Sequence, residues 1–208
     1  MSTPEVELRS AWQHLVGMHH PQQLDHLLAR YREPHRRYHT ATHIMWVLRH
    51  VEEIAADGLD LSVDVGAVRL AALYHDLVYD INRSDNEAAS AESAQRVAFE
   101  IGWSKVRAAT AHRLVMATAT HAPARADEAV MVDADLAILG AEPNDYAAYV
   151  QGVRMEYAHV KIEEWKAGRS MVLRRFLDSP TLFHTAYMFH ERESRARANL
   201  AAELAGLA

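Results

Sequence analysis

Two adjacent polar residues, His75 and Asp76, stand inside an otherwise largely apolar run at 68–79. A stretch that is apolar on nearly every side predicts a helix buried within a domain. An ionised carboxylate in such a place is heavily penalised by desolvation, and proteins pair these groups with a cation or give them to a metal ion. The sequence therefore predicts a functional site around Asp76, because a local cost of this kind tends to mark one.

Two further segments carry residue types that bind metals. His39 and His43 stand four residues apart, so they share a helix face if the helix has begun at His39. Asp135 lies in a second apolar run, at 132–139. Neutral imidazoles together with carboxylates suit a divalent cation such as Mn²⁺, Fe²⁺, Co²⁺, Ni²⁺ or Zn²⁺. Taken alone, a buried His75 bonded to a backbone carbonyl is the simpler explanation, but the three segments together favour a metal site.

The composition of the chain limits its class. Its 208 residues fit one large domain better than two small ones, and 50% hydrophobic with 24% charged residues predict a sizeable folded core. The formal net charge of -6 argues against a surface that binds nucleic acids or anionic membranes in general. It does not exclude a local basic pocket. The absence of cysteine excludes disulfides, thiolate catalysis and cysteine-based zinc sites. Residues 1–16 carry no apolar leader and no run approaches about 18 apolar residues, so we expect a cytoplasmic protein with no membrane partner.

The elements that must position these residues are expected to be helices. Glycine (8) and proline (6) are sparse, and convincing alternation of period two is absent. Helices are predicted at 5–17, 22–32, 40–57, 62–80, 86–101, 104–120, 127–139, 143–158, 160–178 and 181–205. The segment at 84–87 has the S-x-x-E form of a capping box and should open the helix that follows it. The fold prediction is an all-α, single-domain bundle over 1–208, with a metal-site core at about 36–140 and helices at 143–205 packing on it.

The order His43, His75-Asp76, Asp135 resembles the H…HD…D signature of the HD-domain metal-dependent phosphohydrolases. In particular, the chain is similar to a bacterial subgroup of predicted HD phosphohydrolases over about residues 30–200. The shared segments are R-x-Y-H-x-x-x-H at 36–43, D-N-E-x-x-S-A at 85–91, D-x-D-L-x-I-L-G at 133–140 and R-x-E-Y at 154–157. Ordered segments with matching flanks make this resemblance far more specific than the two-letter HD motif alone.

The resemblance implies an all-helical HD-type bundle that binds one divalent metal ion through His43, His75, Asp76 and Asp135. The ion is expected to be Mn, Fe, Co, Ni, Zn or Mg. The resemblance also implies a hydrolase in which metal-activated water cleaves a phosphoester or phosphoanhydride of a small phosphorylated metabolite, with a nucleotide favoured.

Three side chains are predicted catalytic residues for proton transfer or for orienting water, namely His39, Asp80 and Glu87. Asp80 follows Asp76 by four residues and would lie on the same helix face. In related HD hydrolases of alarmone pyrophosphates the motif runs H-D-x-x-E-D, and this chain has Tyr79 at the glutamate position, which argues against that activity. Each candidate has a structural alternative: His39 as a helix cap, Asp80 as a solvated acid at a helix end, and Glu87 as the capping-box glutamate.

Four arginines and one histidine are predicted to bind substrate phosphate: Arg36, Arg37, Arg83, Arg154 and His121. Guanidinium groups bind phosphate through two parallel hydrogen bonds. Taken singly, each of the three arginines that flank the metal ligands is more often a surface residue. Arg154 could line the pocket or form an ion pair between helices. His121 stands where some HD proteins bind a second metal, but the other histidines of that pattern are missing, so one metal is expected.

Two neighbouring polar residues are given structural roles. Asp133 could support the metal site from outside, but a charge near the N-terminus of its helix is the simpler explanation. His50 lies near polar residues and is expected at the surface.

A competing hypothesis is a non-catalytic, metal-dependent sensor that binds a nucleotide and signals through a partner. The full ligand set favours the enzyme, since a pure binder needs no open metal position. A structural metal bundle is a third alternative, and the lack of a fourth nitrogen or sulfur ligand disfavours it. The expected partner is a small phosphorylated substrate, and a homo-oligomer is left open.

Overall fold

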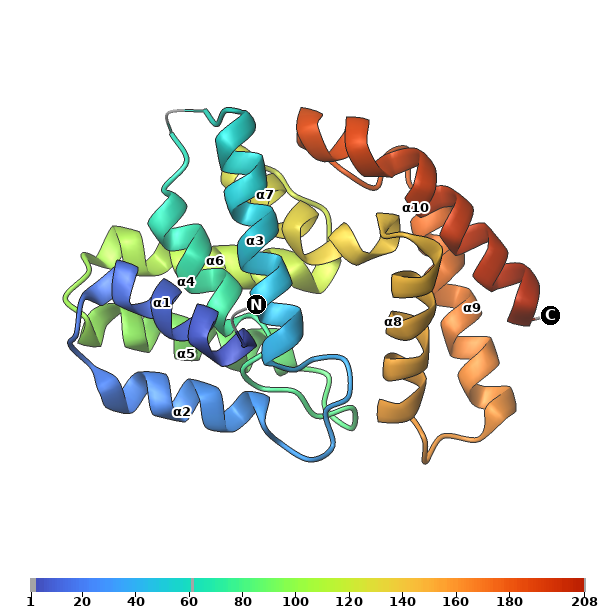
Figure 1. Cartoon of the computed structure of the whole chain (residues 1–208), viewed down its shortest axis with the longest axis horizontal. Coiled ribbons are helices and arrows are strands. Elements are labelled where there is room, and N and C mark those ends of the chain that lie inside the picture. Colours follow the sequence, from blue (N-terminus) through green and yellow to red (C-terminus); the bar gives the residue numbers. More distant parts are fainter. Residues whose placement is uncertain (1–2, 61, 208) are drawn as a thin grey trace.

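Helices account for the regular structure in residues 3–60 and 62–207, which are the part of the chain that the computed structural model describes. Residues 1, 2, 61 and 208, which the predicted domain 1–208 includes, lie outside the described part. Within it there is no β-strand, which confirms the predicted all-α class (Figure 1). In chain order the elements are α1 (Pro4–Val16), α2 (Pro21–Tyr31), α3 (Ala41–Asp57), α4 (Val65–Tyr74), α5 (Asn86–Glu100), α6 (Lys105–Thr120), α7 (Ala126–Leu136), the 3-10 helix η1 (Ala137–Gly140), α8 (Pro143–Glu156), α9 (Ile162–Asp178) and α10 (Ala186–Leu207).

Local sequence signals set most of the helix starts. Proline stands in the first turn of α1, α2 and α8, where its missing N–H leaves no bond unmade. The side chains of Thr40, Asp64 and Ser104 cap α3, α4 and α6 by accepting backbone N–H bonds. Most of the predicted helix ranges therefore agree with the observed ones to within a few residues.

Helix α4 ends at Tyr74, and the prediction that it continues to residue 80 is wrong. Asn86 binds the backbone N–H and carbonyl of Asp80, and Asp80 Oδ1 accepts the N–H of Asn82. Such local side-chain bonds compete with continuation of a helix. As a consequence Asp80 and Asp76 do not share a helix face, contrary to the prediction.

The capping box predicted at 84–87 does not form. Helix α5 begins at Asn86, with Asp85 as its N-cap residue and without a side-chain cap bond. Both carboxylate oxygens of Asp85 instead accept hydrogen bonds from Arg83, at 2.8 and 2.9 Å. Glu87, in the first turn of α5, therefore does not have the capping role that the motif predicts.

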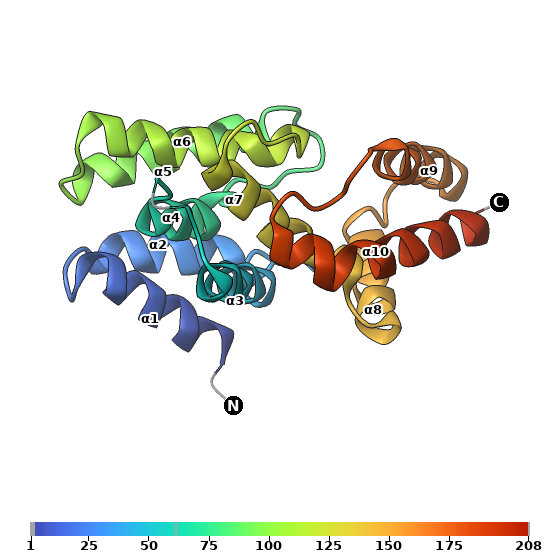
Figure 2. The ribbon, with the colours of Figure 1, turned by 90° about the horizontal axis from the view of Figure 1, so that it is seen from above.

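Helix α4 lies at the centre of the molecule. Its residues from Ala67 to Tyr74, apart from Arg69, are at most 1% exposed. Helices α1, α3, α5, α6 and α7 all pack against it. Figure 2 shows α5 and α6 on one side of α4, and α1, α2 and α3 on the other. Burial on all sides explains why this segment is apolar almost throughout.

Helices α8, α9 and α10 lie beside this body and connect to it through η1 (Figures 1 and 2). Gly140, at the end of η1, allows a close approach to α10, because a Cβ atom there would lie 2.8 Å from the carbonyl oxygen of Arg192. Asn199 of α10 donates to the carbonyl groups of Leu139 and Ala141. Hydrogen bonds from Asn199 therefore connect α10 directly to the backbone at the end of η1.

Asp133 makes a second connection between α7 and α10. It is fully buried, and its carboxylate accepts the backbone N–H groups of His184 and Thr185 and the hydroxyl of Thr185. These donors immediately precede α10. The prediction that Asp133 is the N-terminal charge of its own helix is wrong, because α7 begins seven residues earlier at Ala126.

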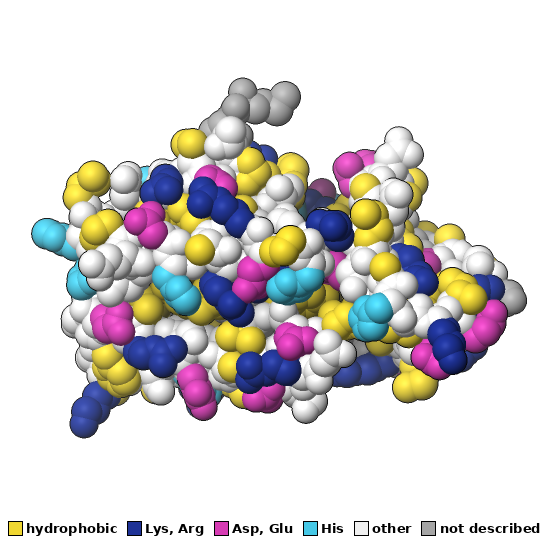
Figure 3. Space-filling view, turned by 90° about the horizontal axis from the view of Figure 1, so that it is seen from below, with side chains coloured by type: hydrophobic (Ala, Val, Ile, Leu, Met, Phe, Trp, Pro, Cys, Tyr) yellow, Lys and Arg dark blue, Asp and Glu magenta, His cyan; other side chains and the backbone are white. Residues whose placement is uncertain are grey.

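The outer surface carries mixed charge. On the face shown in Figure 3, basic and acidic side chains are interspersed. Several arginines pair with an acid, as Arg32 does with Glu5 and Arg69 with Glu52. In the described residues, none of the helices combines the length and the apolar character needed to cross a membrane.

Candidate metal centre

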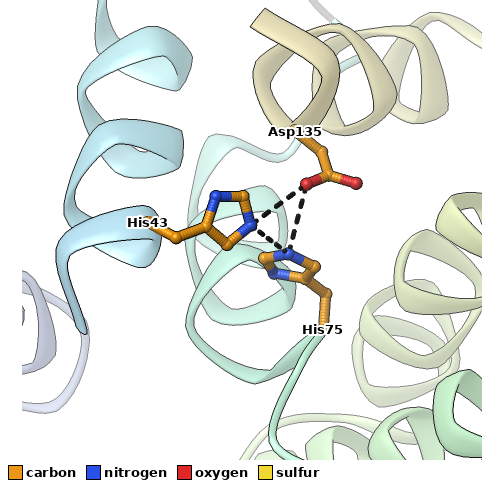
Figure 4. Close-up of side chains that lie close together, drawn as sticks. All are labelled: His43, His75 and Asp135. Atoms are coloured by element: carbon orange, nitrogen blue, oxygen red, sulfur yellow. Dashed lines mark hydrogen bonds and ion pairs between the residues drawn. The ribbon is translucent and has the colours of Figure 1, made fainter. Parts of the chain in front are cut away.

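The predicted metal ligands meet where three helix ends converge. His43 lies in the first turn of α3, His75 is the C-cap residue of α4 with Asp76 next to it, and Asp135 lies in the last turn of α7. The side chains of His43, His75 and Asp135 point toward one another (Figure 4). The pair His75-Asp76 therefore does not interrupt a buried helix, as the sequence suggested, but directly follows its last turn.

Donor atoms of these residues lie close together. His43 Nε2 is 3.1 Å from His75 Nε2, and Asp135 Oδ1 is 3.2 and 3.4 Å from these two nitrogen atoms. Asp76 Oδ2 is 3.4 and 3.2 Å from the same two atoms. Neighbouring ligands of an ion at about 2.1 Å are separated by about 3.0 to 3.4 Å in octahedral or tetrahedral geometry. The cluster of His43, His75 and Asp135 could therefore hold a metal ion, and Asp76 stands beside it.

The tautomer of His75 also suits a metal ligand. Its Nδ1 atom lies 3.0 Å from the carbonyl oxygen of Ala72. A carbonyl oxygen only accepts, so Nδ1 carries the hydrogen and the neutral ring keeps its lone pair on Nε2. Nε2 is the atom that faces His43 and Asp135. The backbone carbonyl that would explain a buried histidine thus orients His75 and leaves its other nitrogen available.

The two buried carboxylates of the cluster need a compensating positive charge. Burial acts to raise the pKa of Asp135, but the nearby histidines, His75 first, hold that pKa well below its usual range. The pKa of Asp76 is also well below its usual range, because His75 and His39 outweigh burial. Burial acts to lower the pKa of His75, and the two aspartates raise it well above its usual value. Buried carboxylates need positive charge nearby, which protonated histidines or a divalent ion can supply.

A cavity of about 380 Å³ opens beside the cluster, next to Asp76. We call it the polar cavity, and it is lined by His39, His75, Asp76, Tyr79, Ile81, Arg83, Ser84, Asn86, Glu87, Thr118, His121, Asp135 and Tyr157. His39, Arg83, Glu87 and His121, which the sequence predicts to be functional, are among these residues. The fold thus brings five separate segments of the chain to one cavity.

The residues of the polar cavity differ in how far their side chains are already bonded. His121 adopts a left-handed backbone conformation (φ 53°) at the end of α6, and its Nε2 lies 3.6 Å from Asp135 Oδ2. Arg83 forms an exposed ion pair with Asp85. The side-chain carboxylate of Glu87 makes no hydrogen bond or ion pair to any residue in the described ranges. Glu87 is therefore the acid of this cavity with the freest carboxylate.

Glu156 is a residue whose role the sequence did not reveal. Its carboxylate accepts the backbone N–H groups of Arg37, Tyr38 and His39, together with His39 Nδ1 at 2.7 Å and the hydroxyl of Tyr79 at 2.8 Å. Burial acts to raise the pKa of Glu156, but the bonds from His39 and the backbone lower it to about 2. Glu156 thus fixes the segment before α3 and orients the ring of His39. The R-x-E-Y segment at 154–157 was the sequence signal for it.

Two arginines predicted to bind substrate lie outside both the polar cavity and the larger cavity described below. Arg36 is 3% exposed, and its guanidinium donates to the carbonyl groups of His39, Asp76 and Leu77. Arg154 donates to the carbonyl of Tyr157, after the end of α8. Both side chains are committed to backbone carbonyls, which explains why neither lines the polar cavity. Arg36 instead holds the backbone on both sides of the metal centre.

A larger cavity, of about 510 Å³, meets the metal centre at His43 and Asp135. We call it the aromatic cavity, because its walls include Tyr38, Trp46, His50 and Tyr149. Arg37, predicted to bind substrate, lines this cavity and not the polar one. His50 was expected at the surface, but it is only 7% exposed because its ring stacks on Trp46. Asp80 is exposed and lines neither cavity.

Two histidines and two aspartates gathered at the ends of buried helices define a class of all-helical metal-site proteins. The sequence of residues 40–151, which includes all four predicted ligands, matches the model of the HD domain. The chain therefore belongs to the HD-domain family, whose members are in general metal-dependent phosphohydrolases, and the resemblance seen in the sequence is confirmed. Neither the curated proteins nor the solved structures that were searched contain a match to this chain.

Proposed function

We propose that this protein is a metal-dependent phosphohydrolase that cleaves a phosphoester or phosphoanhydride bond of a small phosphorylated metabolite, with a nucleotide as the favoured substrate. The observation that carries the proposal is the convergence of His43, His75, Asp76 and Asp135 beside a polar cavity. Membership of the HD-domain family supports the class of reaction. The four residues would hold one divalent ion, which is Mn, Fe, Co, Ni, Zn or Mg.

When bound, a divalent ion supplies a more acidic water molecule and a Lewis acid for a phosphoryl oxygen. The chain's own residues provide the rest of the site. Asp76 and Asp135 balance the two charges of such an ion, so the attraction for phosphate also depends on the hydrogen-bond donors beside the site. His121 and Arg83 line the polar cavity and offer N–H donors to phosphate oxygens. Arg83 can exchange its exposed partner Asp85 for phosphate, because exposed ion pairs are weak.

His39 and Glu87 are the residues we assign to proton transfer. In hydrolysis the water oxygen bonds to phosphorus, the bond from phosphorus to the leaving oxygen breaks, and a proton passes from the water to that oxygen. His39 Nδ1 is committed to Glu156, so Nε2 is the atom that can accept or donate this proton. Glu87 lines the same cavity with an unbonded carboxylate that can orient the water.

A phosphate-release assay tests the proposal, using nucleotides with Mn²⁺, Co²⁺, Ni²⁺ or Mg²⁺. We expect turnover of at least one nucleotide, and we expect Asp76→Ala to lower the rate by about 100-fold or more together with the metal content. Asp25→Asn, which removes an exposed charge on α2, is the control.

Two outcomes would overturn parts of this proposal. Full metal content and activity in Asp76→Ala would show that the site is assigned wrongly. If no nucleotide or other phosphoester released phosphate with any metal, the protein would not be a hydrolase. A nucleotide that bound tightly and stayed intact for hours would then favour the sensor.

A further inference from the structure

The aromatic cavity reaches the metal centre from a different direction than the polar cavity. It lies where α8 faces α3 (Figure 1), and it touches the centre at His43 and Asp135. The polar cavity touches it at His75, Asp76 and Asp135. Asp135 therefore borders both spaces. The volume of about 510 Å³ lies in the range of cavities that enclose a small organic ligand.

One wall of this cavity presents a flat, apolar surface. Trp46 is 46% exposed, although it is a large hydrophobic residue. Its ring stacks on His50 at 5.9 Å with an angle of 23° between the planes, and the guanidinium of Arg49 lies 4.7 Å from the ring centre. The contacts with His50 and Arg49 fix the orientation of the indole, and the exposed part of the residue remains open to a ligand.

A second aromatic pair, Tyr38 and Tyr149, also lines the cavity. Tyr38 and Tyr149 contact each other edge to face, with ring centres 4.7 Å apart. Tyr38 also lies 4.9 Å from the ring of His43, next to the metal centre. Aromatic walls of this kind favour a planar ligand, because ring faces offer dispersion and stacking contacts that an aliphatic chain uses poorly.

The space in front of these rings is kept open by small residues. Ala134, Ala137, Ala141 and Ala148 line the cavity from α7, η1 and α8. Half of the lining residues are polar or charged, and they include three arginines and two acids outside the metal centre, Glu142 and Asp145. Arg37 and Arg192 each donate to a single backbone carbonyl, at 3.4 and 3.3 Å, and have N–H groups to spare. A cavity that combines aromatic and aliphatic walls with polar groups able to fix the orientation of a ligand is suited to a small molecule.

We propose that the aromatic cavity binds the organic half of the substrate, and that this half is a planar aromatic group with polar edges, such as the base of a nucleoside. The phosphate end of the same molecule lies at the metal centre and in the polar cavity, a placement that rests on the proposed hydrolase function. Trp46, Tyr38 and Tyr149 then determine which leaving group the site accepts. The arginines at the cavity bind the polar edges of the ring.

The test uses ligands without phosphate, so that it does not depend on metal or on turnover. Binding of adenosine, guanosine, cytidine and uridine to the full chain is measured by calorimetry in the presence of a chelator. Ala148→Trp fills the cavity from α8, and Ala147→Trp places the same side chain on the neighbouring exposed position, which does not line the cavity. We expect at least one nucleoside to bind the wild type and Ala147→Trp alike, and to bind Ala148→Trp about tenfold or more weakly.

A second variant protects the test against a folding defect in Ala148→Trp. Trp46→Ala removes the flat wall, and its high exposure makes a large loss of stability unexpected. Circular dichroism and thermal unfolding check all variants. We expect Trp46→Ala to weaken nucleoside binding as well. Failure of every nucleoside to bind, or equal weakening by the two tryptophan insertions, would overturn the inference.

The outcome also separates this inference from the proposed function. Asp76→Ala should lose phosphate release from nucleotides while it keeps nucleoside binding. Nucleoside binding that depends on Ala148, in a wild type that hydrolyses nothing, would support the cavity and overturn the hydrolase. Nucleotide hydrolysis that Ala148→Trp left unchanged would support the hydrolase and overturn the cavity.

Discussion

The two sides of helix α7 show how differently a fold can use a buried acid. Asp133 faces the start of α10, where it accepts the N–H groups of His184 and Thr185 and a hydroxyl. Asp135, two residues later, faces the Nε2 atoms of His43 and His75. The donors to the first acid are two backbone N–H groups and the hydroxyl of Thr185, all fixed at the start of α10. The second has partners that a metal ion can replace.

The comparison of Asp133 with Asp135 shows that burial of a carboxylate does not by itself identify a metal ligand. The pKa of Asp133 is raised because burial outweighs its hydrogen bonds, whereas the pKa of Asp135 is lowered because the histidines outweigh burial. Asp133 therefore contributes to the connection between helices. Asp135 contributes a negative charge that a bound cation can neutralise. The predictions below test this contrast at individual residues.

Asp135→Asn should have the largest effect. The substitution removes a ligand charge but keeps the size of the side chain, so we expect metal affinity to fall by about 100-fold or more. Without metal the free energy of unfolding should fall less than the metal affinity, because Asp76 remains as a charge partner of both histidines. Titration calorimetry with Mn²⁺ or Zn²⁺ and chemical unfolding in chelator measure the two quantities. Unchanged metal affinity would show that Asp135 is not a metal ligand, and the proposed difference between Asp133 and Asp135 would be wrong.

Asp133→Ala should have the opposite pattern. It leaves the N–H groups before α10 without acceptors in the protein interior, so we expect a loss of about 3 kcal/mol in the free energy of unfolding. The metal affinity of the folded fraction should stay within about twofold of the wild type, since the carboxylate makes no contact with the cluster. Urea unfolding of this variant beside Asp25→Ala gives the comparison. A loss of metal binding without a loss of stability would contradict it.

The same contrast explains how much of the site the sequence could reveal. His43, His75, Asp76 and Asp135 stand out because polar residues in apolar helical runs need an unusual explanation. Helix starts follow from local caps and prolines, which a sequence displays directly. Both kinds of signal depend on residues that are neighbours in the chain.

Roles that depend on distant backbone groups could not be read in this way. Arg36 is committed to the carbonyls of Asp76 and Leu77, which exist as free acceptors only because α4 stops at Tyr74. Glu156 accepts N–H groups of the segment at 37–39, more than a hundred residues away in the chain. Neither partner is visible before the chain has folded.

Glu156→Gln extends the contrast to an acid that orients another side chain. The amide cannot accept all the bonds that the carboxylate accepts, so His39 and the segment at 37–39 lose part of their anchoring. We expect the free energy of unfolding to fall by about 2 kcal/mol and kcat to fall by about tenfold, with a smaller change in KM. Steady-state kinetics on the substrate identified in the phosphate-release assay measure this split. A change in KM alone would show that Glu156 does not act through His39.

The pH dependence of stability gives a smaller effect from the same residue. The pKa of Glu156 is about 2 in the folded protein, below its usual value of 4.5. A lowered pKa means that its contribution is fully present above pH 4.5 and is lost as the pH falls toward 2. The difference in unfolding free energy between wild type and Glu156→Gln should therefore narrow by about 1 to 2 kcal/mol from pH 6 to pH 3. Urea unfolding in chelator measures it, and a constant difference would argue against ionised Glu156 as the anchor.

Arg83→Ala should have the smallest effect, because Arg83 is an exposed residue, unlike the buried acids discussed above. Arg83 lines the polar cavity with a guanidinium that is bound only to the exposed Asp85. Its removal should leave stability unchanged and raise KM for the phosphorylated substrate by about threefold, because one exposed ion pair with phosphate is weak. Arg32→Ala is the matched control, since Arg32 is also exposed and pairs with a single acid, Glu5, but lines neither cavity. Equal values of KM in the two variants would show that Arg83 does not contact phosphate. His121 would then be the donor that remains in the polar cavity.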